Sequence, residues 1–273
     1  MLIKTLVENR TCSPSFKPKH GLSLYVKTNK HQLLFDVGST TLFLDNAKKL
    51  GVDIRDIDIL IVSHGHLDHG GALEYFFEVN KKATVYLQDK ALDEHFILDK
   101  ENNYSNVSLN INKEDLKRVI FVKNYLKIDD ELSLVSNVTG HRCYPSNNKK
   151  LYKKENGIYI NDDFEHEEHL LIQESKTLLI SGCCHNGLVN VLDHLKELEL
   201  PKPDLIISGL HLLDPISKIS EDDDFIKEYA LELKKYDIPL YTCHCTGYEN
   251  YLKLKEILGA KINYLATGEV IEL

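Results

Sequence analysis

This 273-residue sequence has no tryptophan, one methionine and only seven prolines, and no apolar run in it is long enough to cross a membrane. Proline and glycine are too scarce for a collagen-like chain. The first ten residues, MLIKTLVENR, also lack the central apolar segment and the small-residue cleavage site of a secretory signal. We therefore expect a globular, cytoplasmic protein with no membrane partner.

A net positive charge is absent as well. The chain has 33 Lys and Arg residues against 42 Asp and Glu residues, which gives a formal charge of −9. Such an anionic protein repels the phosphates of nucleic acids, so we do not expect DNA or RNA as a partner. We expect a small-molecule substrate instead, whereas nothing in the sequence indicates the oligomeric state.

Cysteine is limited to six residues, and a chain of this length can bury a core without disulfides. Because we see no export signal, we expect these thiols to be reduced. Histidine, by contrast, is abundant, with 13 residues. The position of these histidines along the chain is therefore the main guide to function.

Strand-like and helix-like segments alternate without a change in composition, which predicts one domain over residues 1–273 with a layered α/β architecture. Apolar runs predict strands at residues 2–7, 22–27, 32–35, 57–62, 83–87, 119–122, 132–135, 169–172, 177–180, 204–208 and 239–242. Helical periodicity and end signals predict helices at residues 42–50, 72–79 and 188–198, and further helices after residues 221 and 247. Several histidines follow directly after strands, at the edge where ligands gather in layered α/β folds.

Irregular lid or binding segments are expected within residues 89–165. Residues 89–112 are polar and rich in asparagine, with weak helical periodicity around Phe96, so we expect a helix and a loop there. Residues 140–165 have no clear period. Long irregular connections inside a compact domain are typical of lids and binding loops, so we expect these segments to cover a site.

The strongest signal is His64-x-His66-x-Asp68-His69, which follows the apolar strand at residues 57–62. Alternate residues of an extended segment point the same way, so His64 and His66 can bind one ion. Asp68 and His69 come after the chain turns and can reach a second ion. Imidazole and carboxylate ligands suit Zn²⁺, Mn²⁺ or Fe²⁺ better than Ca²⁺. The sequence therefore predicts two divalent metal ions as cofactors, with Zn²⁺ preferred and Mn²⁺ or Fe²⁺ as alternatives.

The chain resembles the metallo-β-lactamase superfamily at this motif and at an upstream FDxG motif, Phe35 to Gly38. Further segments are similar to the dihydropterin-synthase-like subgroup of that superfamily, namely HGLSL (20–24), LLFDVGST (33–40), SHGHLDHGGAL (63–73), SGCCHNGLVN (181–190), SGLHL (208–212) and HCTG (244–247). The similarity runs in order along nearly the whole chain and is weakest over residues 89–165. It implies a four-layer αββα sandwich with a dinuclear metal site between the two sheets.

The resemblance also implies a ligand set for each ion. It assigns His64 and His66 to the first ion. It assigns Asp68, His69 and His244 to the second ion.

The third ligand of the first ion is open between two histidines. His185 is preferred over His141 because its loop is short, rich in glycine and framed by strands. Many superfamily members have a bridging aspartate after this strand, where the present chain has Gly182-Cys183. Cys183 is therefore a further candidate ligand through its thiolate, unless His185 takes over that position.

Three further residues are candidates for supporting or catalytic roles. Asp36 can accept the second imidazole N–H of a ligand and orient it, or it can be a simple turn residue. His211 follows a strand between two ligand-bearing loops, and it can protonate a leaving group or stabilise an oxyanion, unless it is a surface residue. Asp68 is positioned to steer the proton of the attacking water. We therefore expect Asp68 and His211 to be catalytic, and His20 to face the same pocket.

The remaining histidines and the basic cluster have ordinary interpretations. His31, His95 and His194 are expected on the surface or on helices. His166 and His169 lie in the polar run FEHEEHL, which is more typical of a solvated strand entrance than of a third metal site. The only local basic cluster consists of lysines 149, 150, 153 and 154. It is a solvated loop unless it attracts a phosphorylated substrate.

The motif chemistry and the resemblance together predict a dinuclear metal-dependent hydrolase that attacks a small, anionic or heterocyclic substrate with a metal-bound hydroxide. Bacterial members of the subgroup are mostly called metal-dependent hydrolases. Archaeal members are described as joining a dihydropterin to a ribofuranosyl-aminobenzene phosphate, so a metal-dependent transferase is the first alternative. A non-catalytic sensor that binds a small ligand at the metal site is the second.

Overall fold

The computed structural model describes residues 1–273 and contains two seven-stranded sheets. The first sheet contains, in spatial order, β18 (Val270–Glu272), β1 (Leu2–Val7), β2 (Ser23–Lys27), β3 (Gln32–Phe35), β4 (Ile59–Val62), β5 (Thr84–Gln88) and β8 (Val119–Val122). The second contains β17 (Ile262–Tyr264), β16 (Leu240–Thr242), β15 (Leu205–Ser208), β14 (Thr177–Ile180), β13 (Glu168–Gln173), β10 (Leu132–Ser136) and β9 (Tyr125–Lys127). Each sheet has an antiparallel half and a parallel half, and the parallel halves are β3-β4-β5-β8 and β14-β15-β16-β17.

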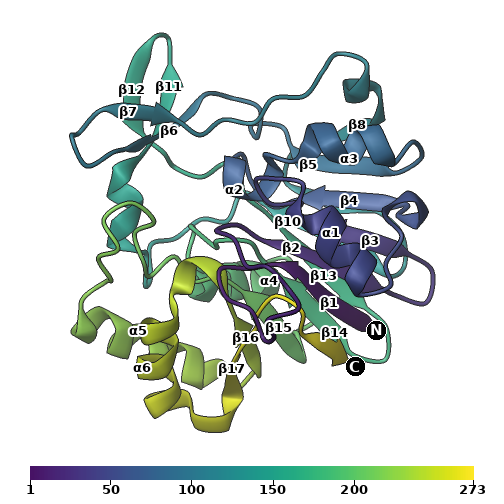
Figure 1. Cartoon of the computed structure of the whole chain (residues 1–273). Coiled ribbons are helices and arrows are strands. Elements are labelled where there is room, and N and C mark those ends of the chain that lie inside the picture. Colours follow the sequence, from purple (N-terminus) through teal and green to yellow (C-terminus); the bar gives the residue numbers. More distant parts are fainter.

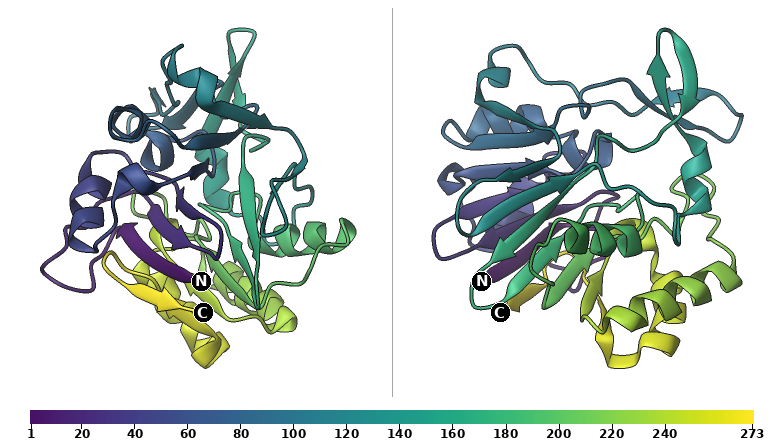
Figure 2. Two further views of the ribbon diagram at one scale, coloured as in Figure 1. Left: turned by 90° about the vertical axis from the view of Figure 1, so that its right-hand side faces the viewer. Right: turned by 180° about the vertical axis from the view of Figure 1, so that it is seen from behind.

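Helices cover the outer faces of both sheets (Figures 1 and 2). The helices are α1 (Leu42–Lys49), α2 (Leu67–Gly70), α3 (Leu73–Val79), α4 (Leu188–Glu197), α5 (Asp223–Tyr236) and α6 (Tyr248–Leu258). Short 3₁₀ helices are η1 (Ile54–Asp56), η2 (Asp115–Arg118), η3 (Ser146–Lys150), η4 (His244–Thr246) and η5 (Gly259–Lys261). None of the helices combines the length and the apolar character that a membrane span needs.

Three hydrophobic clusters show how the layers pack. One joins inward-facing side chains of the two sheets, including Leu33 and Ile61 of the first sheet and Ile180 of the second. Another lies between the first sheet and helices α1 and α3, and includes Leu34 and Leu60. A third lies between the second sheet and helices α4, α5 and α6. Because successive strand residues point to opposite faces, both faces of the central strands are buried. The expected four-layer αββα sandwich is confirmed.

A third, four-stranded sheet was not expected from the sequence. It has the order β12 (Ile158–Asn161), β11 (Leu151–Glu155), β6 (His95–Leu98) and β7 (Tyr104–Asn106), and it lies to one side of the sandwich (Figure 1). The prediction of a helix around Phe96 is wrong. Phe96 lies in β6 and pairs with Tyr152 of β11, so its backbone hydrogen bonds are made across the sheet. The stretch 140–165, expected to be irregular, likewise contains η3 and the β11–β12 hairpin.

The other predicted elements agree with the structure to within a few residues. Strand β3 occupies the predicted residues, and β4 begins two residues later than predicted because Ile57 and Asp58 follow η1. The helix expected after residue 221 is α5, whose first turn is capped by the Asp222 side chain accepting the Phe225 N–H at 2.8 Å. The chain ends lie side by side, since β1 pairs with β18 (Figure 2).

Candidate metal centre

The predicted site residues converge at the carboxyl ends of the parallel strands of both sheets. His64 follows β4, His185 follows β14, His211 follows β15 and His244 follows β16. All four histidines are buried, with at most 4% of their surface exposed. Residues separated by up to 180 positions in the sequence therefore meet at one place in the fold.

The backbone at these strand ends adopts unusual conformations. Asp36, Cys184, His211 and His244 have φ values of 62°, 56°, 47° and 52°, in the left-handed region that non-glycine residues rarely occupy. Such a conformation costs on the order of 1–3 kcal/mol and is found where surrounding contacts enforce it, often at functional sites. At His244 the enforcing contact is a hydrogen bond from its backbone N–H to Glu8 Oε1 at 2.7 Å.

The first group consists of the ligands predicted for the first ion, His64, His66 and His185, which have neighbouring rings. The coordinating atoms of His64 and His185 lie within 4.8 Å of each other, whereas those of His66 lie nearer to His95, Asp162 and His166. The ring centroids of the three predicted ligands are 4.6, 5.0 and 5.1 Å apart, and the Nε2 atom of each ring is buried without a hydrogen-bond partner. Burial, reinforced by the neighbouring imidazoles, lowers the pKa of His64 well below its usual value, so its ring is neutral. Neutral imidazoles with bare, buried nitrogens fit a metal ion, because such nitrogens are otherwise costly to leave unpaired.

The second group contains Asp68, His69, Cys183 and His244, whose coordinating atoms all lie within 4.8 Å of one another. The Nε2 atom of His69 is 3.2 Å from both His244 Nε2 and Cys183 Sγ, and Asp68 Oδ2 is 3.1 Å from His244 Nε2. Cys183 also belongs to a group with His64 and His185. Its thiol therefore lies between the two ligand groups.

Hydrogen bonds fix the ring orientation of four of these histidines. The Nδ1 atom of His69 donates to Asp36 Oδ2 at 2.6 Å, and that of His185 donates to Asn148 Oδ1 at 3.0 Å. The Nδ1 atom of His244 donates to Asn9 Oδ1 at 2.9 Å. For His64, the partner is the Ser63 hydroxyl at 2.8 Å, which itself donates to Asp36. In each ring the proton is therefore assigned to Nδ1, and Nε2 is left free to bind an ion.

Asp36 thus has the supporting position considered for it. Besides His69, its carboxylate accepts hydrogen bonds from the Ser63 backbone N–H at 2.7 Å and the Ser63 hydroxyl at 2.8 Å. The asparagines Asn9 and Asn148 play the same supporting part but were missed in the sequence. No local pattern distinguishes them from other loop asparagines, since each is separated from its histidine by tens of residues or more.

The catalytic candidates differ in exposure and in their neighbours. Asp68 keeps 24% of its side chain exposed and contacts His20 Nε2 at 3.2 Å, so these two residues form the open side of the site. His211 is buried beside His185, with ring centroids 4.2 Å apart, and neither of its ring nitrogens has a hydrogen-bond partner. The alternative ligand His141 is exposed, contacts the Tyr144 ring edge to face and belongs to no ligand group.

Other expectations about histidines and lysines have mixed outcomes. His95, His166 and His169 were expected to be solvated or on helices, but this is wrong because each is at most 1% exposed. These side chains have buried polar partners: His95 and His166 bond to Asp162, and His169 bonds to the Ser181 hydroxyl. The polar sequence run does not indicate these contacts. In the basic cluster, Lys150 pairs with Asp214 and Lys153 pairs with acidic neighbours, so much of its charge is compensated.

Comparisons with known proteins agree with this geometry. Residues 17–122 match the family model described as the metallo-beta-lactamase superfamily. An uncharacterised protein of Methanocaldococcus jannaschii is 27% identical, with 94% of each chain covered. From the same organism, a 7,8-dihydropterin-6-methyl-4-(β-D-ribofuranosyl)-aminobenzene-5′-phosphate synthase is also 27% identical, covering 94% of this chain and 91% of the synthase.

A solved structure is similar over its whole length. The crystal structure of Tm1679, described as a metal-dependent hydrolase of the β-lactamase superfamily, superimposes with a TM-score of 0.82 and 27% identity. The match covers all of this chain and 99% of that one. The resemblance inferred from the motifs is therefore confirmed at the level of the superfamily and its fold.

Proposed function

We propose that this chain, which resembles the metallo-β-lactamase superfamily in sequence and in fold, is a dinuclear metal-dependent hydrolase acting on a small, anionic or heterocyclic substrate. The observation that supports this most directly is the common orientation of four buried histidines. In His64, His69, His185 and His244, the Nδ1 atom is occupied by a hydrogen bond while Nε2 faces the ligand groups. This is the arrangement expected of imidazoles that bind metal.

The proposed ligand assignment follows the two groups. His64, His66 and His185 would hold the first ion, and Asp68, His69 and His244 would hold the second, with the Cys183 thiolate available to both. Histidine, carboxylate and thiolate ligands favour Zn²⁺, with Mn²⁺ or Fe²⁺ as alternatives. When bound, two divalent ions would acidify a water molecule and polarise the substrate bond to be broken.

The protein's own residues would handle the protons. Asp68 lies at the open side, where its Oδ2 atom can accept the proton of an attacking water, and His20 Nε2 holds this carboxylate at 3.2 Å. His211 is buried beside His185 with both ring nitrogens unpaired. It can therefore donate a hydrogen bond to a developing oxyanion or a proton to the leaving group.

A transferase is the second candidate because of a specific relative. The synthase of Methanocaldococcus jannaschii that matches 94% of this chain is named for a product containing a dihydropterin and an arylamine ribose phosphate. A site that binds such a phosphorylated heterocycle would share the ligand groups described above. Hydrolysis and transfer differ only in whether water or a second substrate attacks.

The experiment is a metal analysis coupled to a substrate panel. We expect purified protein to contain two divalent ions per chain and to hydrolyse a phosphodiester, ester or lactone reporter. Chelation and dialysis should abolish this activity, and Zn²⁺ or Mn²⁺ should restore it. Full activity after the metal is removed would refute the proposal.

Two controls separate the alternatives. A condensed pterin–aryl product, detected by mass spectrometry, would assign transfer instead of hydrolysis. Stoichiometric binding of a panel compound without turnover would assign a sensor. The His211→Ala variant should keep both ions and lose turnover, which distinguishes a catalytic role for His211 from a ligand role.

A further inference from the structure

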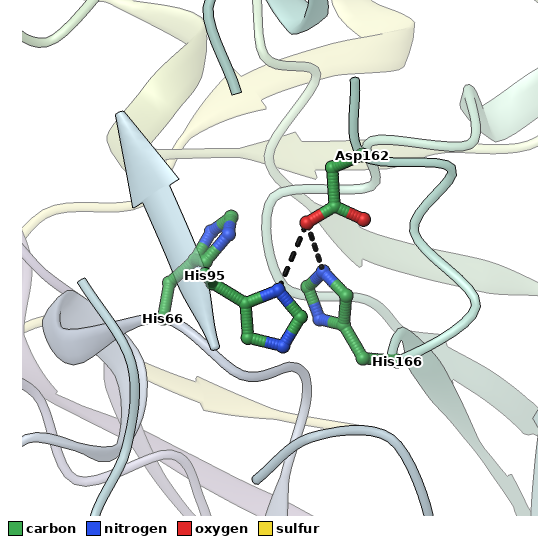
Figure 3. A group of neighbouring side chains, drawn as sticks. All are labelled: His66, His95, Asp162 and His166. Carbon is green, nitrogen blue, oxygen red and sulfur yellow. Dashed lines mark hydrogen bonds and ion pairs between the residues drawn. The ribbon is translucent and has the colours of Figure 1, made fainter. Parts of the chain in front are cut away.

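A second cluster of buried side chains lies beside the segment 63–69 after β4, which carries four of the proposed ligands and is called the metal-binding loop below. It consists of His95, Asp162 and His166, which lie next to His66 (Figure 3). His95 begins β6 and Asp162 directly follows β12, so both come from the third sheet, whereas His166 lies just before β13. All three are at most 5% exposed.

Asp162 links the two histidines through one oxygen atom. Its Oδ2 accepts hydrogen bonds from His95 Nδ1 at 2.9 Å and from His166 Nε2 at 3.2 Å (Figure 3). Its Oδ1 accepts the Phe164 N–H at 2.8 Å. Although burial opposes ionisation, the neighbouring His166 and His95 hold the pKa of Asp162 well below its usual range. The carboxylate is therefore ionised and fully hydrogen-bonded.

Both histidines reach the glycine between two predicted metal ligands. The Gly65 N–H donates to His166 Nδ1 at 2.9 Å. On the other side, a Cβ atom at Gly65 would lie 2.8 Å from the His95 ring and 2.6 Å from the Ala91 carbonyl oxygen. Only glycine fits there, so the backbone between His64 and His66 is held from both sides.

The hydrogen-bond pattern argues against a third ion in this cluster, although the coordinating atoms lie within 4.8 Å of one another. Because His166 Nδ1 accepts a hydrogen bond from Gly65, the proton of the neutral ring must be on Nε2, where it is donated to Asp162. A protonated Nε2 cannot bind metal. In His95, Nδ1 faces Asp162 and Nε2 faces the Lys90 carbonyl oxygen at 3.2 Å, so both nitrogens point at hydrogen-bond acceptors of the protein.

We propose that His95, Asp162 and His166 form a positioning unit that holds Gly65 and thereby fixes His64 and His66 for the first ion. The unit joins the third sheet to the metal-binding loop, because two of its members come from that sheet. This inference rests on the proposed metal centre. It adds that the affinity for the first ion depends on these three residues, none of which touches that ion, whereas the affinity for the second ion does not depend on them.

The test compares metal binding in three variants of the full-length protein. Asp162→Asn removes the charge that joins the two histidines, and His166→Leu removes the acceptor for the Gly65 N–H. His166→Asn is the rescue variant, because its amide oxygen can take the place of Nδ1. Asp163→Asn is the matched control, since this neighbouring carboxylate is exposed and pairs with Lys153.

The readouts are ion content by elemental analysis, affinity by competition with a chromophoric chelator, and the absorption spectrum of the Co²⁺-loaded protein. We expect Asp162→Asn and His166→Leu to weaken one ion by about 10- to 100-fold and to alter its Co²⁺ spectrum. The other ion should bind as in the wild type, and His166→Asn should recover part of the loss. The metal-free Tm is measured for every variant, so that a loss of folding is recognised.

Several results would overturn the inference. Unchanged affinity for both ions in a folded Asp162→Asn or His166→Leu variant would show that the unit does not position the loop. A wild type with three ions and an Asp162→Asn variant with two would make the cluster a metal site instead. A wild type that binds no divalent ion would refute the proposed function itself, and the inference with it. If Asp162→Asn does not fold, the comparison of His166→Leu with His166→Asn decides.

Discussion

Replacing Asp36 with asparagine should weaken the binding of the second ion while leaving the shape of the site almost unchanged. Asp36 is fully buried, and its Oδ1 accepts the Ser63 N–H at 2.7 Å. Its Oδ2 accepts from the Ser63 hydroxyl at 2.8 Å and from His69 Nδ1 at 2.6 Å. In Asp36→Asn the amide oxygen keeps the bond to the Ser63 backbone, so the amide N–H₂ replaces Oδ2 and faces His69.

The consequence follows from the two tautomers of His69. An amide N–H facing Nδ1 favours the ring form that carries its proton on Nε2, the nitrogen that lies 3.2 Å from His244 and from Cys183. To bind an ion through Nε2, the ring must return to the tautomer with its proton on Nδ1, and this Nδ1–H then faces the amide N–H of the variant side chain. An unsatisfied buried donor costs about 1–3 kcal/mol. At 1.4 kcal/mol per factor of ten, this corresponds to an affinity about 5- to 150-fold weaker.

The assay is competition with a chromophoric chelator, which gives the affinity of each ion separately, supported by elemental analysis after dialysis. The matched control is Asp58→Asn. Asp58 lies at the opposite end of β4, where it accepts the Gln32 N–H at 3.1 Å and touches no candidate ligand. Wild-type affinity for both ions in a folded Asp36→Asn protein would refute the tautomer reasoning.

Further predictions concern individual ligands and pH. His185→Ala should lose the first ion, whereas His141→Ala should keep both, as elemental analysis would show; the reverse result would reassign the third ligand. Cys183→Ser should shift the Co²⁺ absorption spectrum and weaken at least one ion by about tenfold or more, and an unchanged spectrum would exclude the thiolate as a ligand. Partial burial opposes protonation of His31, but the hydrogen bond to Asp129 and the charges of Asp58 and Asp129 together outweigh it and raise the His31 pKa. The stabilisation by this pair is therefore complete below the unfolded-state pKa of about 6.5 and is lost as the pH rises through the folded-state pKa. His31→Asn should thus lower the free energy of unfolding by about 0.5–1 kcal/mol at pH 5.5 and by less at pH 9. Equal effects at both pH values would contradict this.

Much of the sandwich was predictable because its strands are unusually apolar. The run at residues 57–62 is buried on both faces and gives a strong strand signal, as does the run at 177–180. The metal motif was recognisable for the same reason, since it follows directly after one of these strands. His185 and His244 could be added only through the resemblance, because no spacing rule connects residues more than a hundred positions apart.

The third sheet was not predictable from local sequence. The strand β12 is exposed along its whole length, and β6 pairs with β11 across more than fifty residues. Neither strand shows the alternation of apolar and polar residues that indicates a half-buried strand. The prediction that the run FEHEEHL is solvated was wrong for a related reason. Its charged residues suggest solvent, yet Glu167 is buried and accepts the backbone N–H groups of His185 and Asn186 at 2.8 and 3.0 Å.

The topology explains why each proposed ion depends on both halves of the chain. The first ion would be held by His64 and His66 from the first sheet and His185 from the second, and the second ion by Asp68 and His69 from the first and His244 from the second. Each proposed ion would therefore tie the two sheets together at the ends of their parallel strands. Ligand binding to the folded state alone adds about 4 kcal/mol of stability at a thousand times Kd. The left-handed backbone conformations at these strand ends cost free energy of similar order. Metal binding would therefore offset this conformational cost, which in the metal-free protein is offset only by the packing of the sandwich.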